Sequence, residues 1–191
     1  LSLRRQRQMC IRDSIEGEFI KKIGVDLTFD NEIKIIDGNG RIAIPGMIDD
    51  QVHFREPGLT HKGDISSESK AAIAGGVTSY FEMPNTFPNT TSRKEFKKKI
   101  QIASKNSFAN FSFMFGGTND NIDEIKKLDD KDVAGIKLFL GSSTGKMLID
   151  NKDSIEKIFK STSLPISAHC EDEQTIKDNT ESVSYTHLRA H

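Results

Sequence analysis

Short apolar strands alternate with helical segments along most of this sequence, and this alternation limits the possible fold more than any other feature. Five strand-and-helix units follow one another from about residue 45 onward. Their strand-like segments read MIDDQVHF, VTSYFEMP, FANFSFMFGG, VAGIKLFLG and LPISAHCED, and each precedes a polar segment with helical character. Consecutive units of this kind predict right-handed βαβ crossovers and a parallel sheet.

A doubly wound sheet and a (β/α)8 barrel both fit this alternation. No G-x-G-x-x-G follows the first strand, which argues against a dinucleotide-binding sheet. Polar side chains instead lie at or just past the carboxyl ends of four predicted strands, where barrel enzymes hold their sites. These residues are His53 with Arg55, Asn85, Lys137 and His169. We therefore predict an α/β fold that contains about five units of a TIM-type (β/α)8 barrel.

The remaining segments differ in character from the barrel units. Residues 14–44 carry short apolar runs around the turn signal DGNG, and they predict a small β-rich unit ahead of the barrel. Residues 1–13 and 183–191 show no periodicity that connects with their neighbours, so we expect both to be non-native tails. The Arg-rich start lacks the apolar segment of a secretory signal. The incomplete barrel is then expected over residues 45–182.

Charge and cysteine content restrict the partners. A formal net charge of -1 and a pI near 6.6 give no basis for binding to nucleic acid or to an anionic membrane. Two cysteines, Cys10 and Cys170, cannot form a disulfide framework, which indicates a reducing cytoplasm.

The stretch IPGMIDDQVHFREPG, residues 44–58, holds the first group of candidate site residues. If the strand continues through it, side chains at period two share a face, so Gln51, His53 and Arg55 would lie together. An amide, an imidazole and a guanidinium on one face suggest a binding site. The alternative is a strand end whose polar residues merely contact water, which is the more common situation for any one of them.

Lys137 is the sharper signal because it interrupts the apolar strand GIKLFLG. An ammonium inside a barrel has to be paired, neutralised or modified, since an isolated buried charge is costly. Its stem could also lie along apolar surface with its head in water. A neutral lysine beside a divalent cation can add carbon dioxide, and the resulting carbamate could bridge two metal ions, with His53 on one and His169 on the other. Imidazole and oxygen donors suit zinc.

Four motifs together carry a resemblance to a known family. PGMIDDQVHFREPGLTHKGDI, AAIAGGVTSYFEMPNTFPNTT, GIKLFLGSSTG and AHCEDE resemble the dihydroorotases of the amidohydrolase superfamily. The resemblance implies a metal-dependent enzyme of pyrimidine biosynthesis that interconverts dihydroorotate and N-carbamoyl-aspartate. It implies metal ligation by His53, by carboxylated Lys137 and by His169, with one or two Zn²⁺ ions as the expected cofactor. Arg55 and Asn85 would hold the substrate carboxylate, as a guanidinium fork and an amide can.

The sequence departs from the family pattern in two places. Gln51 stands where the motif has its first histidine, and it is a further candidate ligand, although an amide oxygen binds zinc weakly. The family's catalytic aspartate follows an eighth strand, so we expect no catalytic residue within these five units. A five-unit barrel cannot close and would expose a strand edge. We therefore expect an amino-terminal fragment that is inactive alone, from a protein that could form homo-oligomers.

Three alternatives stay open. A hydantoinase or allantoinase would share the metals but should lack the pair Arg55 and Asn85. A non-catalytic dihydroorotase-like protein, serving as a structural partner, is suggested by Gln51. The third alternative is that the 191 residues do not fold at all.

Overall fold

We describe the protein from a computed structural model in which two compact units, Leu1–Pro45 and Gly46–His191, are distinguished. The structure describes residues 12–25, 27–28, 33–129, 131–141, 147–172, 174–176 and 178–180. The predicted tails therefore lie almost entirely outside the described residues. None of the helices in these ranges has the length and apolar character needed to span a bilayer.

The first unit contains an antiparallel hairpin of β1 (Arg12–Glu16) and β2 (Phe19–Gly24). Gly17 turns the chain between the strands with a φ of 61°, a backbone region that suits glycine. Arg12 pairs with Gly24 and Asp13 pairs with Ile23, so the hairpin includes these two residues of the predicted tail.

The predicted DGNG turn is present in the first unit, but its flanking segments are not strands. Arg41 N donates to Gly38 O at 2.9 Å, and Asn39 has a φ of 49°. Residues 33–38 and 41–46 form no regular ladder. Ile35 and Ile36 are 81% and 82% exposed, so no face of this segment is buried, and burial of one face is what normally holds a strand in register.

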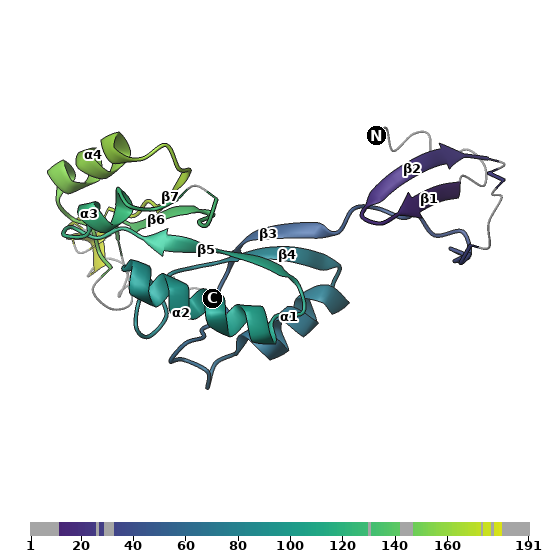
Figure 1. Ribbon diagram of the computed structural model, residues 1–191. Helices are drawn as coiled ribbons and strands as arrows, with labels where there is room; N and C mark the ends of the chain where they lie inside the picture. Colours follow the sequence, from purple (N-terminus) through teal and green to yellow (C-terminus); the bar gives the residue numbers. More distant parts are fainter. Residues whose placement is uncertain are drawn as a thin grey trace. The chain divides into compact units, whose positions relative to one another are not determined.

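The second unit is built on a five-stranded parallel sheet in the order β3-β4-β5-β6-β7, in which neighbours along the chain are neighbours in the sheet (Figure 1). The strands are β3 (Met47–Val52), β4 (Val77–Glu82), β5 (Asn110–Gly116), β6 (Gly135–Phe139) and β7 (Ile166–His169). This sequential parallel order is that of a (β/α)8 barrel, because a doubly wound sheet reverses direction at a switch point. The predicted fold class is confirmed.

Helices connect successive strands. They are α1 (Ile65–Ala74), α2 (Arg93–Asn106), α3 (Ile122–Ile125) and α4 (Lys152–Ser161). Ser92 caps α2, since its Oγ accepts from Glu95 N at 3.3 Å. α3 spans a single turn, and Asn121 before it does not cap it through its side chain, since the amide nitrogen donates to Gly116 O and Thr91 O.

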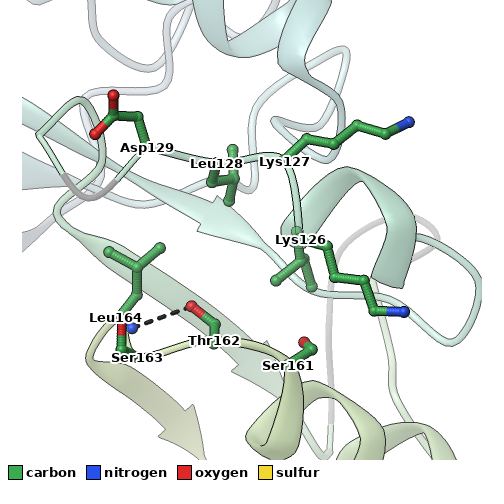
Figure 2. A pocket seen from close by; sticks show the side chains of 9 residues that line it. Lys126, Lys127, Leu128, Asp129, Ser161, Thr162, Ser163 and Leu164 are labelled. Atoms are coloured by element: carbon green, nitrogen blue, oxygen red, sulfur yellow. Dashed lines mark hydrogen bonds between the residues drawn. The ribbon is translucent and has the colours of Figure 1, made fainter.

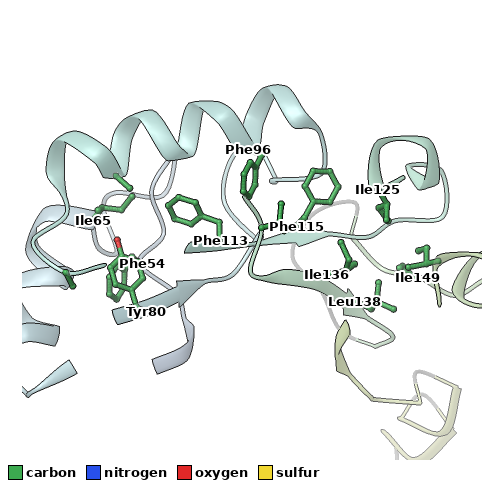
Figure 3. Packing of buried hydrophobic residues seen from close by; sticks show 14 residues of the cluster. Phe54, Ile65, Tyr80, Phe96, Phe113, Phe115, Ile125, Ile136, Leu138 and Ile149 are labelled. Carbon is green, nitrogen blue, oxygen red and sulfur yellow. The ribbon is translucent and has the colours of Figure 1, made fainter. Parts of the chain in front are cut away.

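The apolar core lies between the helices and one face of the sheet (Figure 3). In β6, Ile136 and Leu138 belong to this core and are fully buried. Because side chains alternate along a strand, Lys137 between them faces the opposite side, which is the interior of a barrel. At the β3 edge, Met47 and Ile48 are 60% and 65% exposed, as expected for an unclosed barrel.

Candidate active site

The predicted site residues lie at one edge of the parallel sheet. His53 and Arg55 follow β3, Asn85 follows β4, and His169 is the last residue of β7. Lys137 is the central residue of β6, two residues before that strand ends. Carboxyl ends of parallel strands meet at the same edge, so four strands deliver polar groups to one region.

Lys137 is buried, with 3% of its surface exposed, and its ammonium meets polar oxygens. Nζ lies 3.2 Å from Gln51 Oε1 on β3 and 3.4 Å from Ser167 Oγ on β7. It also lies 5.5 Å from the centre of the Phe139 ring. The structure thus brings together Gln51 and Lys137, two predicted ligands that are 86 residues apart.

Burial lowers the pKa of Lys137 because removal from water disfavours the ammonium, while Cys170 and Asp50 act in the opposite direction. A lower pKa increases the fraction of neutral amine, which is the form that reacts with carbon dioxide. The environment of this side chain is therefore favourable to carbamate formation.

His53 contacts Asn85, one of the two candidates for substrate binding. Its Nδ1 lies 2.9 Å from Asn85 Oδ1. Because an amide oxygen only accepts, the proton belongs on Nδ1 and the lone pair remains on Nε2. Partial desolvation of the ring, together with the positive charge of Arg55, lowers the pKa of His53. A neutral imidazole with a free Nε2 is the form that binds a metal ion.

His169 is placed differently from the other predicted ligands. Its Nε2 lies 2.8 Å from Glu171 Oε1, and its ring stacks on Phe139 at 6.3 Å. Among the side-chain contacts of the described residues, none joins His169 to His53 or Lys137. Nor do three His, Cys, Asp or Glu side chains converge within the described ranges. Of the predicted ligands, only His53 and His169 belong to these four residue types. The predicted site would therefore not form such a group of three.

Arg55 departs from the predicted face. β3 ends at Val52, and Arg55 has a φ of 70°, so the strand alternation that was expected to align it with Gln51 and His53 does not reach it. This left-handed conformation costs an L-residue roughly 1–2 kcal/mol. Arg55 N donates to Glu82 Oε1 at 3.0 Å, which helps to hold it.

Glu82 and Lys99 were not predicted as part of the site. Glu82 ends β4 and Lys99 lies on α2, both with no exposed surface, and Nζ lies 2.7 Å from Oε2. One sequence signal was present, since Lys99 occupies the same helix stripe as the buried residues Phe96 and Ala103.

A hollow elsewhere on the second unit is not part of this site. It has a volume of about 530 Å³ and is lined by residues 125–129 and 161–164 (Figure 2). These segments precede β6 and β7, so they lie at the amino ends of the strands. In barrel enzymes that end contributes to stability rather than to chemistry.

Comparison with known proteins agrees with the motifs and with the sheet. The family described as dihydro-orotase-like matches residues 40–186. The chain belongs to the dihydroorotase-like family. A dihydroorotase from Methanosarcina mazei is 37% identical over 163 residues, which are 84% of this chain and 36% of that protein. The resemblance found in the sequence is confirmed.

Two further matches carry the names of enzymes for other cyclic amides. An allantoinase from Desulfitobacterium hafniense is 35% identical over 154 residues, which are 78% of this chain and 34% of that protein. The solved structure of an L-hydantoinase (dihydropyrimidinase) from Arthrobacter aurescens has a TM-score of 0.80 at 28% identity, covering 86% of this chain and 38% of that one. The chain spans about a third of the length of the curated relatives it matches.

Membership of this family implies a divalent metal, and the side chains at the sheet edge fit one in part. His53 has the required lone pair on Nε2, and Lys137 is buried beside an oxygen donor, Gln51. His169 keeps its Nε2 toward Glu171 and would have to turn or use its other nitrogen.

Proposed function

We propose that the whole protein interconverts dihydroorotate and N-carbamoyl-aspartate, a reaction of pyrimidine biosynthesis. The observation that carries the proposal is the 2.9 Å contact between His53 and Asn85. It joins a candidate metal ligand to a candidate substrate-binding residue, which is what hydrolysis of a ring amide beside a bound carboxylate requires. Family membership supports the same reaction.

We propose that His53, carboxylated Lys137 and His169 hold the metal, with Gln51 as a further ligand. Zinc is the ion that imidazole and carbamate oxygen suit best. When bound, it supplies Lewis acidity and lowers the pKa of a water molecule. Asn85 orients His53 by accepting from Nδ1, and the buried surroundings of Lys137 favour its neutral, reactive form.

In the proposed site, Arg55 and Asn85 bind the carboxylate of the substrate. The guanidinium offers two parallel donors to the two oxygens, and the Asn85 amide nitrogen remains free to donate when its oxygen contacts His53. The general acid and base would be supplied by a residue outside these 191 positions.

A hydantoinase or allantoinase is the second candidate function. The allantoinase relative and the hydantoinase structure support it, since both share the barrel units. Allantoin and hydantoin carry no carboxylate on the ring. The guanidinium of Arg55 at the end of β3 therefore favours dihydroorotate over either ring.

We further propose that residues 45–182 are the amidohydrolase portion, that residues 14–44 form a separate β-rich unit, and that the protein acts in the cytoplasm. The exposed thiol of Cys170 is compatible with a reducing compartment. Homo-oligomer formation belongs to the same proposal.

The test is a steady-state assay of the whole protein with N-carbamoyl-aspartate, dihydroorotate, hydantoin and allantoin. We expect activity with the first two only, loss of activity with a chelator, and recovery with Zn²⁺. Activity with hydantoin or allantoin alone would replace the proposal by the second candidate. Bound zinc near zero in a folded and inactive protein would favour a non-catalytic role.

A further inference from the structure

A buried ion pair lies behind the two residues proposed to bind the substrate carboxylate. Glu82 and Lys99 have no exposed surface, and their charged groups are 2.7 Å apart. Removing two charges from water is so costly that a buried ion pair is seldom more stabilising than an apolar pair of the same size. Stability alone is therefore a weak explanation for this pair.

Each member of the pair also contacts the backbone beside the site. Glu82 Oε1 accepts from Arg55 N at 3.0 Å, while Lys99 Nζ donates to Met83 O at 2.9 Å. Met83 lies two residues before Asn85. The pair thus joins the backbone that carries Arg55 to the backbone that carries Asn85.

Backbone hydrogen bonds also hold these two points, since Leu59 N donates to Arg55 O at 3.1 Å. Arg55 has a φ of 70°, where an L-residue is strained. Met83 N donates to Val52 O at 3.0 Å, which connects the end of β4 to the end of β3. A carboxylate at Arg55 N and an ammonium at Met83 O form charge-assisted hydrogen bonds, which are stronger than neutral ones.

Burial favours neutral forms of both partners, and their mutual attraction opposes this. Burial raises the pKa of Glu82 and lowers the pKa of Lys99. The attraction between the two charges acts against both shifts. Lys99 Nζ lies over the ring of Phe113, 5.2 Å from its centre. The pair is thus enclosed. Among the described residues, its hydrogen bonds to groups outside the pair are those with Arg55 N and Met83 O.

We propose that Glu82 and Lys99 are positioning residues that align Arg55 and Asn85 for the substrate carboxylate. The inference rests on the proposed function, because it assigns the pair to the binding of that carboxylate. Neither residue touches the substrate in this arrangement. Both act through the backbone of the two loops that follow β3 and β4.

The test uses the whole protein with the double substitution Glu82→Met and Lys99→Met. It removes both charges at once, so no unpaired buried charge is left behind. A carboxylate held by aligned donors is bound equally in the ground state and the transition state, so loss of alignment should raise KM and leave kcat unchanged. Because Asn85 also contacts His53, the assay is run with saturating Zn²⁺. We then expect KM for N-carbamoyl-aspartate to rise about tenfold, with kcat within about threefold of the wild type.

Two further variants separate positioning from general stability. Tyr80→Phe removes the hydrogen bond to Ser107 from a fully buried residue on the same strand, and it should lower Tm without changing KM. Glu82→Gln with Lys99→Met keeps an oxygen that can accept from Arg55 N, so its KM should lie between those of the wild type and the double methionine variant.

The outcomes are distinguishable. An unchanged KM in an active protein carrying the double methionine substitution overturns the inference alone, as does a fall of kcat at constant KM. A wild-type protein without activity on either substrate overturns the proposed function and this inference together. If the double methionine variant does not fold, the variant Glu82→Gln with Lys99→Met tests the inference instead. A raised KM at unchanged kcat supports it, and an unchanged KM overturns it.

Discussion

At the scale of single residues, the chain is unusual in the two lysines that it buries. Lys99 is paired with a carboxylate at 2.7 Å, whereas Lys137 contacts the amide oxygen of Gln51 and the hydroxyl of Ser167 among the described residues. A buried ammonium without a close carboxylate is costly, and conversion to a carbamate that binds a cation removes that cost. The two sites therefore call for different experiments.

Lys137→Arg in the whole protein tests the carbamate. Arginine keeps the positive charge but cannot form a carbamate, so we expect kcat/KM to fall at least about 100-fold and bound zinc to decrease. Steady-state kinetics and metal analysis measure both. Lys131→Arg, on an exposed turn, is the matched control and should have no effect. Retention of zinc and activity by the Lys137 variant would rule out a bridging carbamate.

Asn85→Ala tests whether the amide orients His53. Loss of the acceptor at Nδ1 releases the tautomer and ring orientation, so zinc affinity should fall about 10–100-fold. Competition with a chelator measures the affinity. Asn89→Ala in the same turn is the control. A raised KM with unaltered zinc affinity would assign Asn85 to the substrate alone.

At the scale of elements, side chains at the helix starts define where the helices begin. Asp64, Ser92 and Asn151 each accept from backbone N–H groups in the first turn of α1, α2 and α4. These caps satisfy donors that have no partner within the helix. The loops before α1 and α2 carry His53, Arg55 and Asn85, so the caps at Asp64 and Ser92 also determine where those loops end.

Ser92→Ala should destabilise the protein by about 1 kcal/mol, because the first turn of α2 loses the acceptor for Glu95 N. Urea denaturation of the whole protein measures the free energy of unfolding. Ser104→Ala is the matched control on the same helix, where the hydroxyl is exposed and contacts only Gln101 O. It should change stability by less than about 0.5 kcal/mol. Equal losses for the two substitutions would contradict the capping role.

The cap of α1 predicts a pH dependence. The backbone hydrogen bond from Ser67 lowers the pKa of Asp64 from its ordinary value of 3.8. The folded state therefore favours the charged form, and its stabilisation is present above 3.8 and is lost as the pH falls through the lower folded-state pKa. Asp64→Asn keeps an acceptor without a charge. We expect the Tm difference between wild type and variant to shrink between about pH 5 and pH 2. A difference that stays constant with pH would refute this.

At the scale of the whole molecule, the sheet of the second unit has two unpaired edges, β3 and β7, in the described part of the chain. Met47 and Ile48 on β3 are more than half exposed. An edge strand whose outer N–H and C=O groups are unpaired is a template for association with another strand. Strands that continue the barrel would cover these positions in a closed (β/α)8 fold.

The 191 residues expressed alone should therefore self-associate and bind a hydrophobic dye. Analytical ultracentrifugation would detect species larger than the 21.3 kDa monomer. The double substitution Met47→Lys and Ile48→Lys should reduce the association, because charged residues on an edge strand oppose pairing. A monomeric product with cooperative unfolding and no dye binding would show that the five-unit sheet is self-sufficient.

Local patterns were enough to predict most of the second unit. The alternation of strands and helices and the polar residues at or near the carboxyl ends of four strands depend on residues close together in sequence, and the structure contains both. The strands expected on either side of the DGNG turn were wrong, because a strand needs a partner and a buried face, and Ile35 and Ile36 have neither in the described residues.

The sequence by itself determined the parallel sheet, the family and the types of side chain at the sheet edge, since each follows from short-range periodicity or from contiguous motifs. Only the tertiary structure decided which side chains meet. The contact of Lys137 with Gln51, the orientation of His53 by Asn85 and the pair Glu82 with Lys99 join residues on different elements. Distance in space is set by the packing of the whole sheet and its helices, and no local pattern encodes it.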